Sequence, residues 1–421
     1  MNLLGQALAL PSGEILPNRI IKSAMSEVLA DPASGAPTDR LVRLYERWGR
    51  GGAGTLITGH VIVHRSGLGE PGNVMIEDDR HLAALTRWAS AAQANGARLW
   101  MQLNHAGRQA PRRVVAEPLA PSPVAMRGFF GAFARPRALG EAEIARLVDH
   151  FASAAAVARA AGFAGVQLHG AHGYLISQFL SPRTNQRTDG WGGELAGRMR
   201  FLLEVVRAVR AAVGPAFPIG VKLNSADFQR GGFTIDDAMA VARALEAAGI
   251  DLLEVSGGNY ESPAMAGSGE LPAAQRDSSV QREAYFLDYA RRIRGVTKLP
   301  IMLTGGMRSA AVMQEAIASG AIDAVGLARP MAFEPDLPAG LIAGRLAGAT
   351  PTRIRSRVKK IDDMLQVFWF QAQMHRMADG QEPLPGLGRW SALWKGLRAT
   401  FLGMRRAPRG ELPLLPAPAE G

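Results

Sequence analysis

The chain has 421 residues, of which 47% are hydrophobic and none is cysteine, and its formal net charge is +11. Without cysteine the chain can form no disulfide, cysteine-ligated zinc site or cysteine-held iron–sulfur cluster. The positive charge favours phosphate-bearing ligands. Nucleic acid is not an expected partner, because the arginines are dispersed and no nucleic-acid-binding module is recognisable.

The chain also carries no membrane or export signal that sequence patterns would show. No run of 18 apolar residues predicts a transmembrane segment. No basic region precedes an apolar stretch at the N-terminus, as it would in a secretory signal. We therefore expect a cytoplasmic protein.

Short apolar runs alternate with longer segments of helical period, which is the pattern of a parallel sheet with crossover helices. Gly162, Gly249 and Gly320 follow three of the helical segments at the place of a C-cap glycine. The predicted strands are 19–24, 54–58, 98–103, 165–168, 219–223, 251–255, 300–303 and 324–327, and the predicted helices include 141–161, 196–213, 235–248 and 309–319.

Eight strands alternating with helices predict an α/β fold, a (β/α)8 TIM barrel whose active site lies at the C-terminal ends of the strands. The segment LALPSGEILPNRI before the first strand predicts a hairpin that closes the barrel floor. A doubly wound sheet is less favoured, because its first βα turn should hold a GxGxxG loop and none is present.

Two regions depart from this repeat. Residues 256–282 form a long polar, Gly- and Ser-rich segment, and connections of this length are typical of lids or of disordered segments. Residues 351–421 hold 12 Lys and Arg against 6 Asp and Glu, with an aromatic segment LQVFWFQAQMHRM. We expect a helix packed on the barrel flank and a disordered end; a basic helix for a peripheral surface or a homo-oligomer contact is the alternative.

Residues 166–193 read VQLHGAHGYLISQFLSPRTNQRTDGWGG. His169, His172 and Tyr174 follow a buried strand, so two imidazoles and a phenol stand where a ligand would meet the barrel mouth. A buried strand with only a structural role has no need of this group of donors. The stretch therefore predicts the active site.

This stretch resembles the Old Yellow Enzyme family of FMN-dependent ene reductases and NADH:flavin oxidoreductases, with Trp191 where the family usually has Tyr. The motifs NRIIKSAMSE (18–27), QLNHAGRQ (102–109), LTGGMRS (303–309) and VGLARP (325–330) extend the resemblance in the family's order. It covers residues 1–345, expected as an FMN-binding barrel, and leaves 346–421 as a C-terminal helical extension. It implies a short member with one non-covalent FMN and no iron–sulfur cluster.

The resemblance implies where FMN would bind. Gly305 and Gly306 allow backbone N–H groups to approach a phosphate after the seventh strand, where TIM barrels often bind phosphate. Lys222, where the family usually has Arg, would place a positive charge beside the reduced flavin. The full expected set is Ser23, Ala24, Met25, Ser26, Gly59, Gln102, Lys222, Gly305, Gly306, Ala328 and Arg329.

The resemblance also implies a ping-pong reaction in which NAD(P)H is a transient reductant and an electrophilic alkene is the acceptor. His169 and His172 would bind the carbonyl oxygen of the substrate, and Tyr174 would donate a proton to carbon. His105 and Arg108 are expected to be structural supports. Residues 256–282, the insert 126–136 and Val28 would set specificity.

Three other functions stay open at this point. The same flavin site could reduce a quinone or another acceptor. A flavin-free barrel could be an aldolase using Lys222 or a metal enzyme using His169 and His172, although no carboxylate ligand is evident. A non-catalytic flavoprotein could recruit a partner through its C-terminus.

Overall fold

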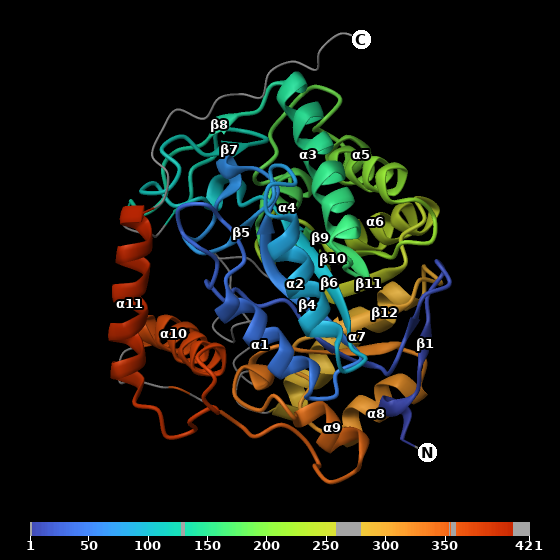
Figure 1. Cartoon of the computed structure of the whole chain (residues 1–421). Helices are drawn as coiled ribbons and strands as arrows, with labels where there is room; N and C mark the ends of the chain where they lie inside the picture. The colour runs from blue at the N-terminus through green and yellow to red at the C-terminus, as the bar shows by residue number, and fades with distance from the viewer. Residues whose placement is uncertain (1, 128–130, 258–278, 353, 355–358, 407–421) are drawn as a thin grey trace.

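Eight parallel strands close on themselves into a barrel (Figure 1), because β3 (Ile20–Lys22) pairs with both β13 (Ala324–Leu327) and β4 (Thr55–Ile62). The computed structural model describes residues 2–127, 131–257, 279–352, 354 and 359–406. The barrel strands are buried almost throughout, as expected for a parallel sheet with side chains inside and helices outside. The remaining barrel strands are β6 (Arg98–Asn104), β9 (Gly165–Gly170), β10 (Ile219–Asn224), β11 (Leu252–Ser256) and β12 (Ile301–Thr304).

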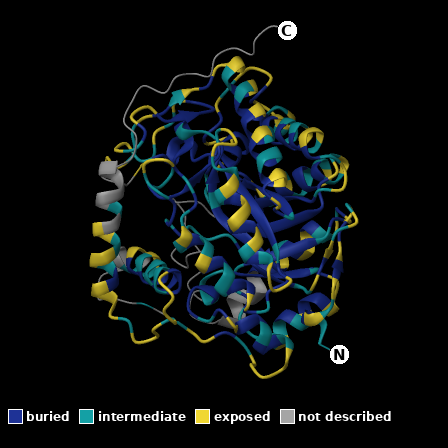
Figure 2. Ribbon diagram, viewed as in Figure 1, coloured by how far each residue is buried: buried dark blue, intermediate teal, exposed yellow. Residues whose placement is uncertain are grey.

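The helices form the outer layer, with exposed residues on their outer faces (Figure 2). Predicted helix bounds agree with the structure to within one residue, and Gly162, Gly249 and Gly320 have the positive φ of C-cap residues. The helices are α1 (Asp39–Gly49), α2 (Leu82–Gln93), α3 (Glu141–Ala160), α4 (Leu175–Leu180), α5 (Leu195–Val213), α6 (Ile235–Ala247), α7 (Ser279–Arg294), α8 (Ala310–Ala318), α9 (Leu337–Ile342), α10 (Lys359–Ala378) and α11 (Arg389–Arg406).

The N-terminal hairpin is confirmed and lies at the barrel floor. Strands β1 (Leu8–Ala9) and β2 (Ile15–Leu16) are antiparallel, and their leucines form one buried cluster with Trp100 inside the barrel. The floor is thus filled by apolar side chains. The opposite end, where the strands terminate, is therefore where a ligand is expected to bind. Besides β1 and β2, the short strands outside the barrel proper are β5 (Val74–Met75), β7 (Leu119–Ala120) and β8 (Arg137–Ala138).

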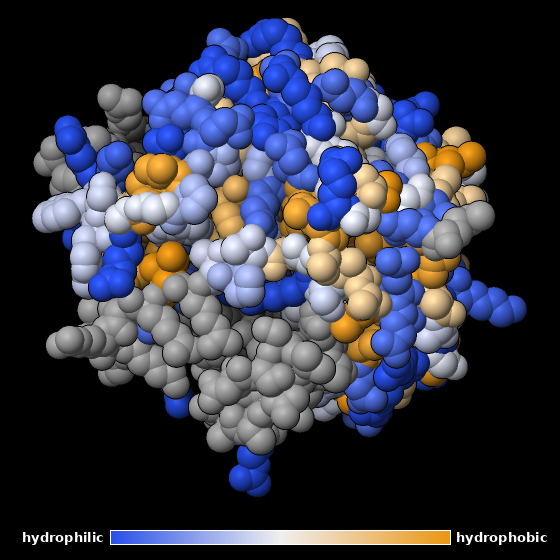
Figure 3. Space-filling model, turned by 90° about the horizontal axis from the view of Figure 1, so that it is seen from below, coloured by the Kyte–Doolittle hydropathy of each residue, from blue (hydrophilic) through white to orange (hydrophobic). Residues whose placement is uncertain are grey.

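The C-terminal extension is helical, as expected, and α10 packs on the barrel. It contacts α1 and the 3-10 helix η6 (Arg329–Ala332), and its residues Trp369 and Phe370 join the main core. Helix α11 lies outside α10, and Trp390 and Trp394 are more than half exposed. Seen from below, some hydrophobic residues, coloured orange, are exposed on the left of the molecule (Figure 3). This is the side on which these two helices lie in Figure 1.

Several expectations lie partly or wholly outside the described residues. These are the lid at 256–282, the insert 126–136 and the disordered end after residue 406. Within the described residues, no helix has the length and hydropathy needed to span a membrane.

Candidate active site

The predicted site residues meet at the C-terminal end of the barrel. Strand register sets Lys222 opposite His169 on one side and Glu254 on the other, and sets His60 opposite Gln102. Residues distant in sequence therefore share one end of the sheet. A single group of polar side chains results, enclosed by strands on all sides.

Three imidazoles and one phenol form a wall at this end, which we call the imidazole wall: His60, His169, His172 and Tyr174. The rings of His60 and His169 are parallel with centroids 5.3 Å apart. Tyr174 meets both rings edge-on at 4.8 and 4.9 Å, and His172 meets His169 edge-on at 5.1 Å. The structure thus brings the three predicted catalytic residues together.

His60 was not predicted from the sequence. The second strand was expected to end at Thr58, but β4 runs to Ile62 with a register shift between Ile57 and His60. Such a bulge re-aims a side chain and is common beside active sites. The signal was present, since a Gly inside an otherwise apolar strand indicates a bulge and Val61 and Ile62 continue the strand pattern.

The wall is neutral around pH 7. Burial lowers the pKa of His60 to about 3, with Lys222 as a further cause. Burial also holds the pKa of His169 and of His172 well below the ordinary value, with the neighbouring imidazoles and Lys222 acting in the same direction. Nδ1 of His169 accepts the Ala171 N–H at 3.2 Å, so its Nε2 carries the proton and can donate.

His172 is held in an unusual backbone conformation. Its φ is +60°, and its N–H donates to Asn224 while its carbonyl accepts from Gln109. Its Nε2 lies 2.8 Å from Ser256 Oγ. Left-handed backbone at a non-glycine residue costs free energy and is concentrated at functional sites.

A chain of polar contacts crosses the barrel beneath the wall. Gln102 Nε2 donates to Gln167 at 2.7 Å, Gln167 donates to Glu254 at 2.7 Å, and Lys222 Nζ lies 3.0 Å from the Glu254 carboxylate. Gln102 Oε1 is buried and has no hydrogen-bond partner in the described structure. A ligand N–H group would satisfy this acceptor.

One cavity joins the imidazole wall to the ends of β12 and β13. His172, Lys222 and Ala24 line one part of it, and Gly305, Gly306, Ala328 and Arg329 line the other. The φ values of Gly305 and Gly306 are +119° and +79°, which only glycine adopts at low cost. We call this second part the cradle, and its glycine backbone together with the charge of Arg329 suits a phosphate.

Four predicted cofactor residues make other contacts. Ser23 Oγ lies 2.8 Å from Thr304 Oγ1, beneath the cradle. The Ser26 hydroxyl donates to the buried Glu70 carboxylate. A Cβ at Gly59 would collide with the Glu27 carboxylate and the Met25 carbonyl, and this crowding explains the glycine there. Met25 itself packs partly buried against the core.

The extension reaches the same cavity, which the sequence did not predict. Phe370 of α10 lines it, and Gln366 accepts from Arg329 at 3.4 Å. Gln371 and His375 lie 3.5 and 2.8 Å from the carbonyl oxygens of Ser26 and Glu27. Helix α10 thus holds the loop after β3 as well as the cradle.

Other motif residues are structural. His105 is buried and bonded to Ser66 at 2.9 Å, and Arg108 donates to the carbonyls of residues 124 and 125, as expected for supports. Asn185 of the loop after α4 donates to the carbonyls of Phe179 and Trp191. No group of three metal-ligating side chains occurs among the described residues.

Known proteins are similar to this chain in amino-acid sequence. A sequence profile of the NADH:flavin oxidoreductase / NADH oxidase family matches residues 12–347. The NADH-dependent flavin oxidoreductase nadA of Aspergillus parasiticus is 38% identical over 347 residues, which cover 79% of this chain and 77% of that protein.

Two solved structures are similar over most of the chain. A 2-naphthoyl-CoA reductase in complex with 2-naphthoyl-CoA has a TM-score of 0.75 and 29% identity, covering 82% of this chain and 53% of that one. This chain therefore spans about half the length of that reductase. An Old Yellow Enzyme homologue from Zymomonas mobilis has a TM-score of 0.71 and 27% identity, covering 86% of this chain and 98% of that one.

Proposed function

Because the chain belongs to the NADH:flavin oxidoreductase / NADH oxidase family and is an FMN-dependent oxidoreductase, we propose that it reduces the activated C=C bond of an enone or an enoyl thioester. The observation that carries the proposal is the imidazole wall, which places a phenol and neutral imidazoles beside the polar end of the cavity.

The cavity fits FMN in three respects. The cradle would hold the phosphate through the backbone at Gly305, Gly306 and Ala328 and the charge of Arg329. The unpartnered Oε1 of Gln102 would accept an N–H of the flavin pyrimidine ring. Lys222 would supply positive charge, since its side chain is buried and lines the cavity. When bound, FMN supplies reversible hydride transfer between NAD(P)H and the acceptor.

The chain's own residues would bind and polarise the acceptor. Because His169 is neutral and its Nε2 carries the proton, it would donate a hydrogen bond to the carbonyl oxygen of the substrate. This donor stabilises the negative charge that develops on that oxygen as the double bond is reduced. His172 would be the second donor, aligned by its contact with Ser256.

Tyr174 would complete the addition to the double bond. It is buried at the start of α4, and its ring contacts both His60 and His169. From there its O–H would protonate the α-carbon, a step for which a positioned acid contributes roughly 10²–10⁴-fold in rate.

The first test of this function is the identity of the bound flavin and of its acceptor. We expect purified protein to carry about one FMN per chain, released by heat and identified by chromatography. Stopped-flow absorbance would then follow reduction by NADH or NADPH and reoxidation by cyclohexenone, by an enoyl thioester and by a quinone. Reoxidation by the quinone alone would replace the alkene by the quinone as acceptor, and finding no flavin after reconstitution would overturn the proposal.

A further inference from the structure

His60 makes a direct contact with the proposed proton donor. Its Nε2 lies 3.4 Å from the Tyr174 hydroxyl oxygen, on the edge where the two rings meet at 4.8 Å. This separation is at the long end for a hydrogen bond, which is common for catalytic contacts before substrate is bound. His60 comes from β4, on the far side of β6 from β9, and so reaches the phenol independently of the HxxHxY motif.

The other nitrogen of His60 indicates its tautomer. Nδ1 lies 3.0 Å from the Asn104 Nδ2 amide group at the end of β6. Since an amide nitrogen can only donate, Nδ1 is the acceptor, and in a neutral imidazole the proton then sits on Nε2. The ring stays neutral because burial lowers its pKa to about 3.

The ring of His60 is also fixed in orientation. The bulge at Thr58 and Gly59 is held by two hydrogen bonds: Thr58 Oγ1 accepts the Gln102 N–H at 2.8 Å, and the Gly59 N–H donates to Glu27 at 2.9 Å. Parallel stacking on His169 restrains the plane of the ring. The Nε2–H bond therefore has one direction, which is toward Tyr174.

We propose that His60 is a positioning residue for Tyr174: its Nε2–H donates to the phenolic oxygen, so that the phenolic proton turns toward the substrate. This inference rests on the proposed function, in which Tyr174 is the acid. A hydride and a proton add to the C=C bond, and the O–H bond of Tyr174 breaks as the new C–H bond forms. The phenolate left behind keeps the His60 hydrogen bond until it regains a proton from water.

The tautomer can be measured without any turnover. In protein carrying ¹⁵N- and ¹³C-labelled histidine, the ring nitrogen shifts distinguish a protonated Nε2 from a protonated Nδ1. The His60 signals are those that disappear in His60→Gln. We expect Nε2 to be protonated, and the Nδ1–H tautomer would overturn the proposal because Tyr174 would then donate to His60.

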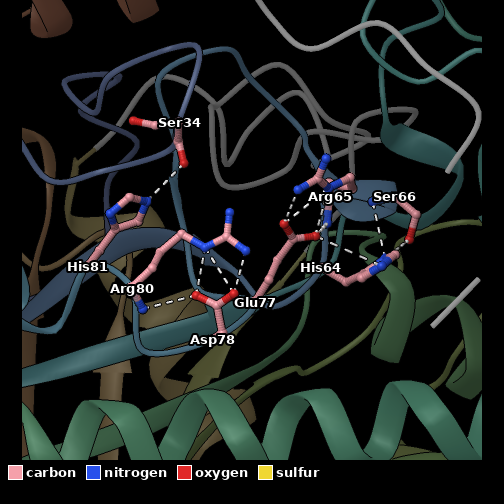
Figure 4. A network of polar contacts seen from close by, with 8 residues as sticks. All are labelled: Ser34, His64, Arg65, Ser66, Glu77, Asp78, Arg80 and His81. Carbon is pink, nitrogen blue, oxygen red and sulfur yellow. Dashed lines mark hydrogen bonds and ion pairs between the residues drawn. The ribbon is translucent and has the colours of Figure 1, made fainter. Parts of the chain in front are cut away.

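His64→Gln is the matched control for this spectrum. His64 is partly buried, and this burial lowers its pKa to about 4, but it lies beyond the end of β4, where it contacts Ser66 and Glu77 (Figure 4). We expect His64→Gln to leave the His60 signals in place and, in protein that also carries labelled tyrosine, the Tyr174 ring signal as well. We expect His60→Phe, which keeps a ring on His169, to shift the Tyr174 ring signal.

A double-mutant cycle separates positioning from packing. We expect His60→Phe to slow reoxidation by cyclohexenone roughly 10- to 100-fold, the range for a hydrogen bond to a charged oxygen. His60→Gln retains an N–H donor and should recover much of that loss. In a Tyr174→Phe background, which lacks the oxygen, His60→Phe should have almost no further effect.

The outcomes are distinct. Equal losses from His60→Phe in both backgrounds would mean that the ring only packs, and would overturn the inference. A wild-type protein that does not reduce any alkene would overturn the proposed function instead, and the histidine spectrum would still report the tautomer. Bound FMN and circular dichroism of each variant exclude misfolding as the cause of a slow rate.

Discussion

The two ends of the cavity are built from different kinds of chemical group, backbone at one end and side chains at the other. The cradle is mainly backbone, from Gly305, Gly306 and Ala328 at the ends of adjacent strands. The imidazole wall is entirely side chains, three imidazoles and a phenol, on β4 and around the end of β9. Backbone groups can hold the phosphate of a cofactor, which takes no part in the reaction, whereas side chains with a defined protonation state are needed for the reacting end. Substitutions should therefore separate cofactor binding from alkene chemistry.

The largest effect should come from Tyr174→Phe, which tests the wall alone. We expect reoxidation by cyclohexenone to slow by about 10²–10⁴-fold, because a positioned acid is lost while the ring and its packing remain. Reduction of the flavin by NAD(P)H should keep its rate, since that step needs no proton on carbon. Stopped-flow measures both steps, and equal slowing of the two would mean that Tyr174 organises the pocket and is not the acid.

Lys222→Met tests the chain of polar contacts beneath the wall. It leaves the fully buried Glu254 carboxylate without its cation, and breaking a buried ion pair costs about 3–5 kcal/mol. Urea unfolding of the flavin-free protein would measure the loss of folding free energy. Adding Glu254→Gln should restore much of it, and Lys298→Met, at an exposed lysine, should change it by less than about 0.5 kcal/mol.

Gly306→Ala tests the cradle alone. The residue has φ +79° and lines the cavity, so a Cβ strains the cradle's backbone by about 1–3 kcal/mol. We expect FMN to bind about tenfold more weakly, which is about 1.4 kcal/mol, with the wall's histidine spectrum unchanged. Gly344→Ala is the control, because it introduces similar strain at φ +68° with open space around the residue. It should lower Tm without weakening the binding of FMN.

Lowering the pH tests the wall separately from the cradle, because backbone groups and guanidinium groups do not titrate between pH 4 and 7. Burial lowers the pKa of His60 to about 3, so the unfolded chain binds this proton below pH 6.5 and the folded protein does not. The contribution of neutral His60 to the free energy of unfolding is therefore fully present above pH 6.5. It is lost as the pH falls, by up to about 1.4 kcal/mol per pH unit. Urea unfolding from pH 7 to 4 should show a shallower loss of unfolding free energy in His60→Gln, and identical slopes would contradict the neutral state of His60.

The sequence predicted most of this architecture because its signals are local. Gly305 and Gly306 directly follow the seventh strand, and HxxHxY directly follows the fourth, so each motif could be placed on a strand end. His60 was missed because it depends on a bulge, which re-aims the side chain and is signalled in the sequence by the single Gly59 inside the strand. The contacts of Ser26 and Gly59 were also beyond reach, since Glu70 and Glu27 meet them only after the chain has folded.

The long-range contacts of helix α10 have a consequence for the order of events during synthesis. Gln371 and His375 bind carbonyls that precede them by 345 and 348 residues, and Phe370 completes the cavity lining. The ribosome must therefore synthesise the chain at least as far as α10 before the loop after β3 has these supports, and it adds about 5–20 residues per second. Contacts of this sequence separation are also the slowest to form. We therefore expect a chain that stops between the last barrel strand and α10 to bury its barrel core and still fail to retain flavin, which makes bound flavin a marker that synthesis has passed α10.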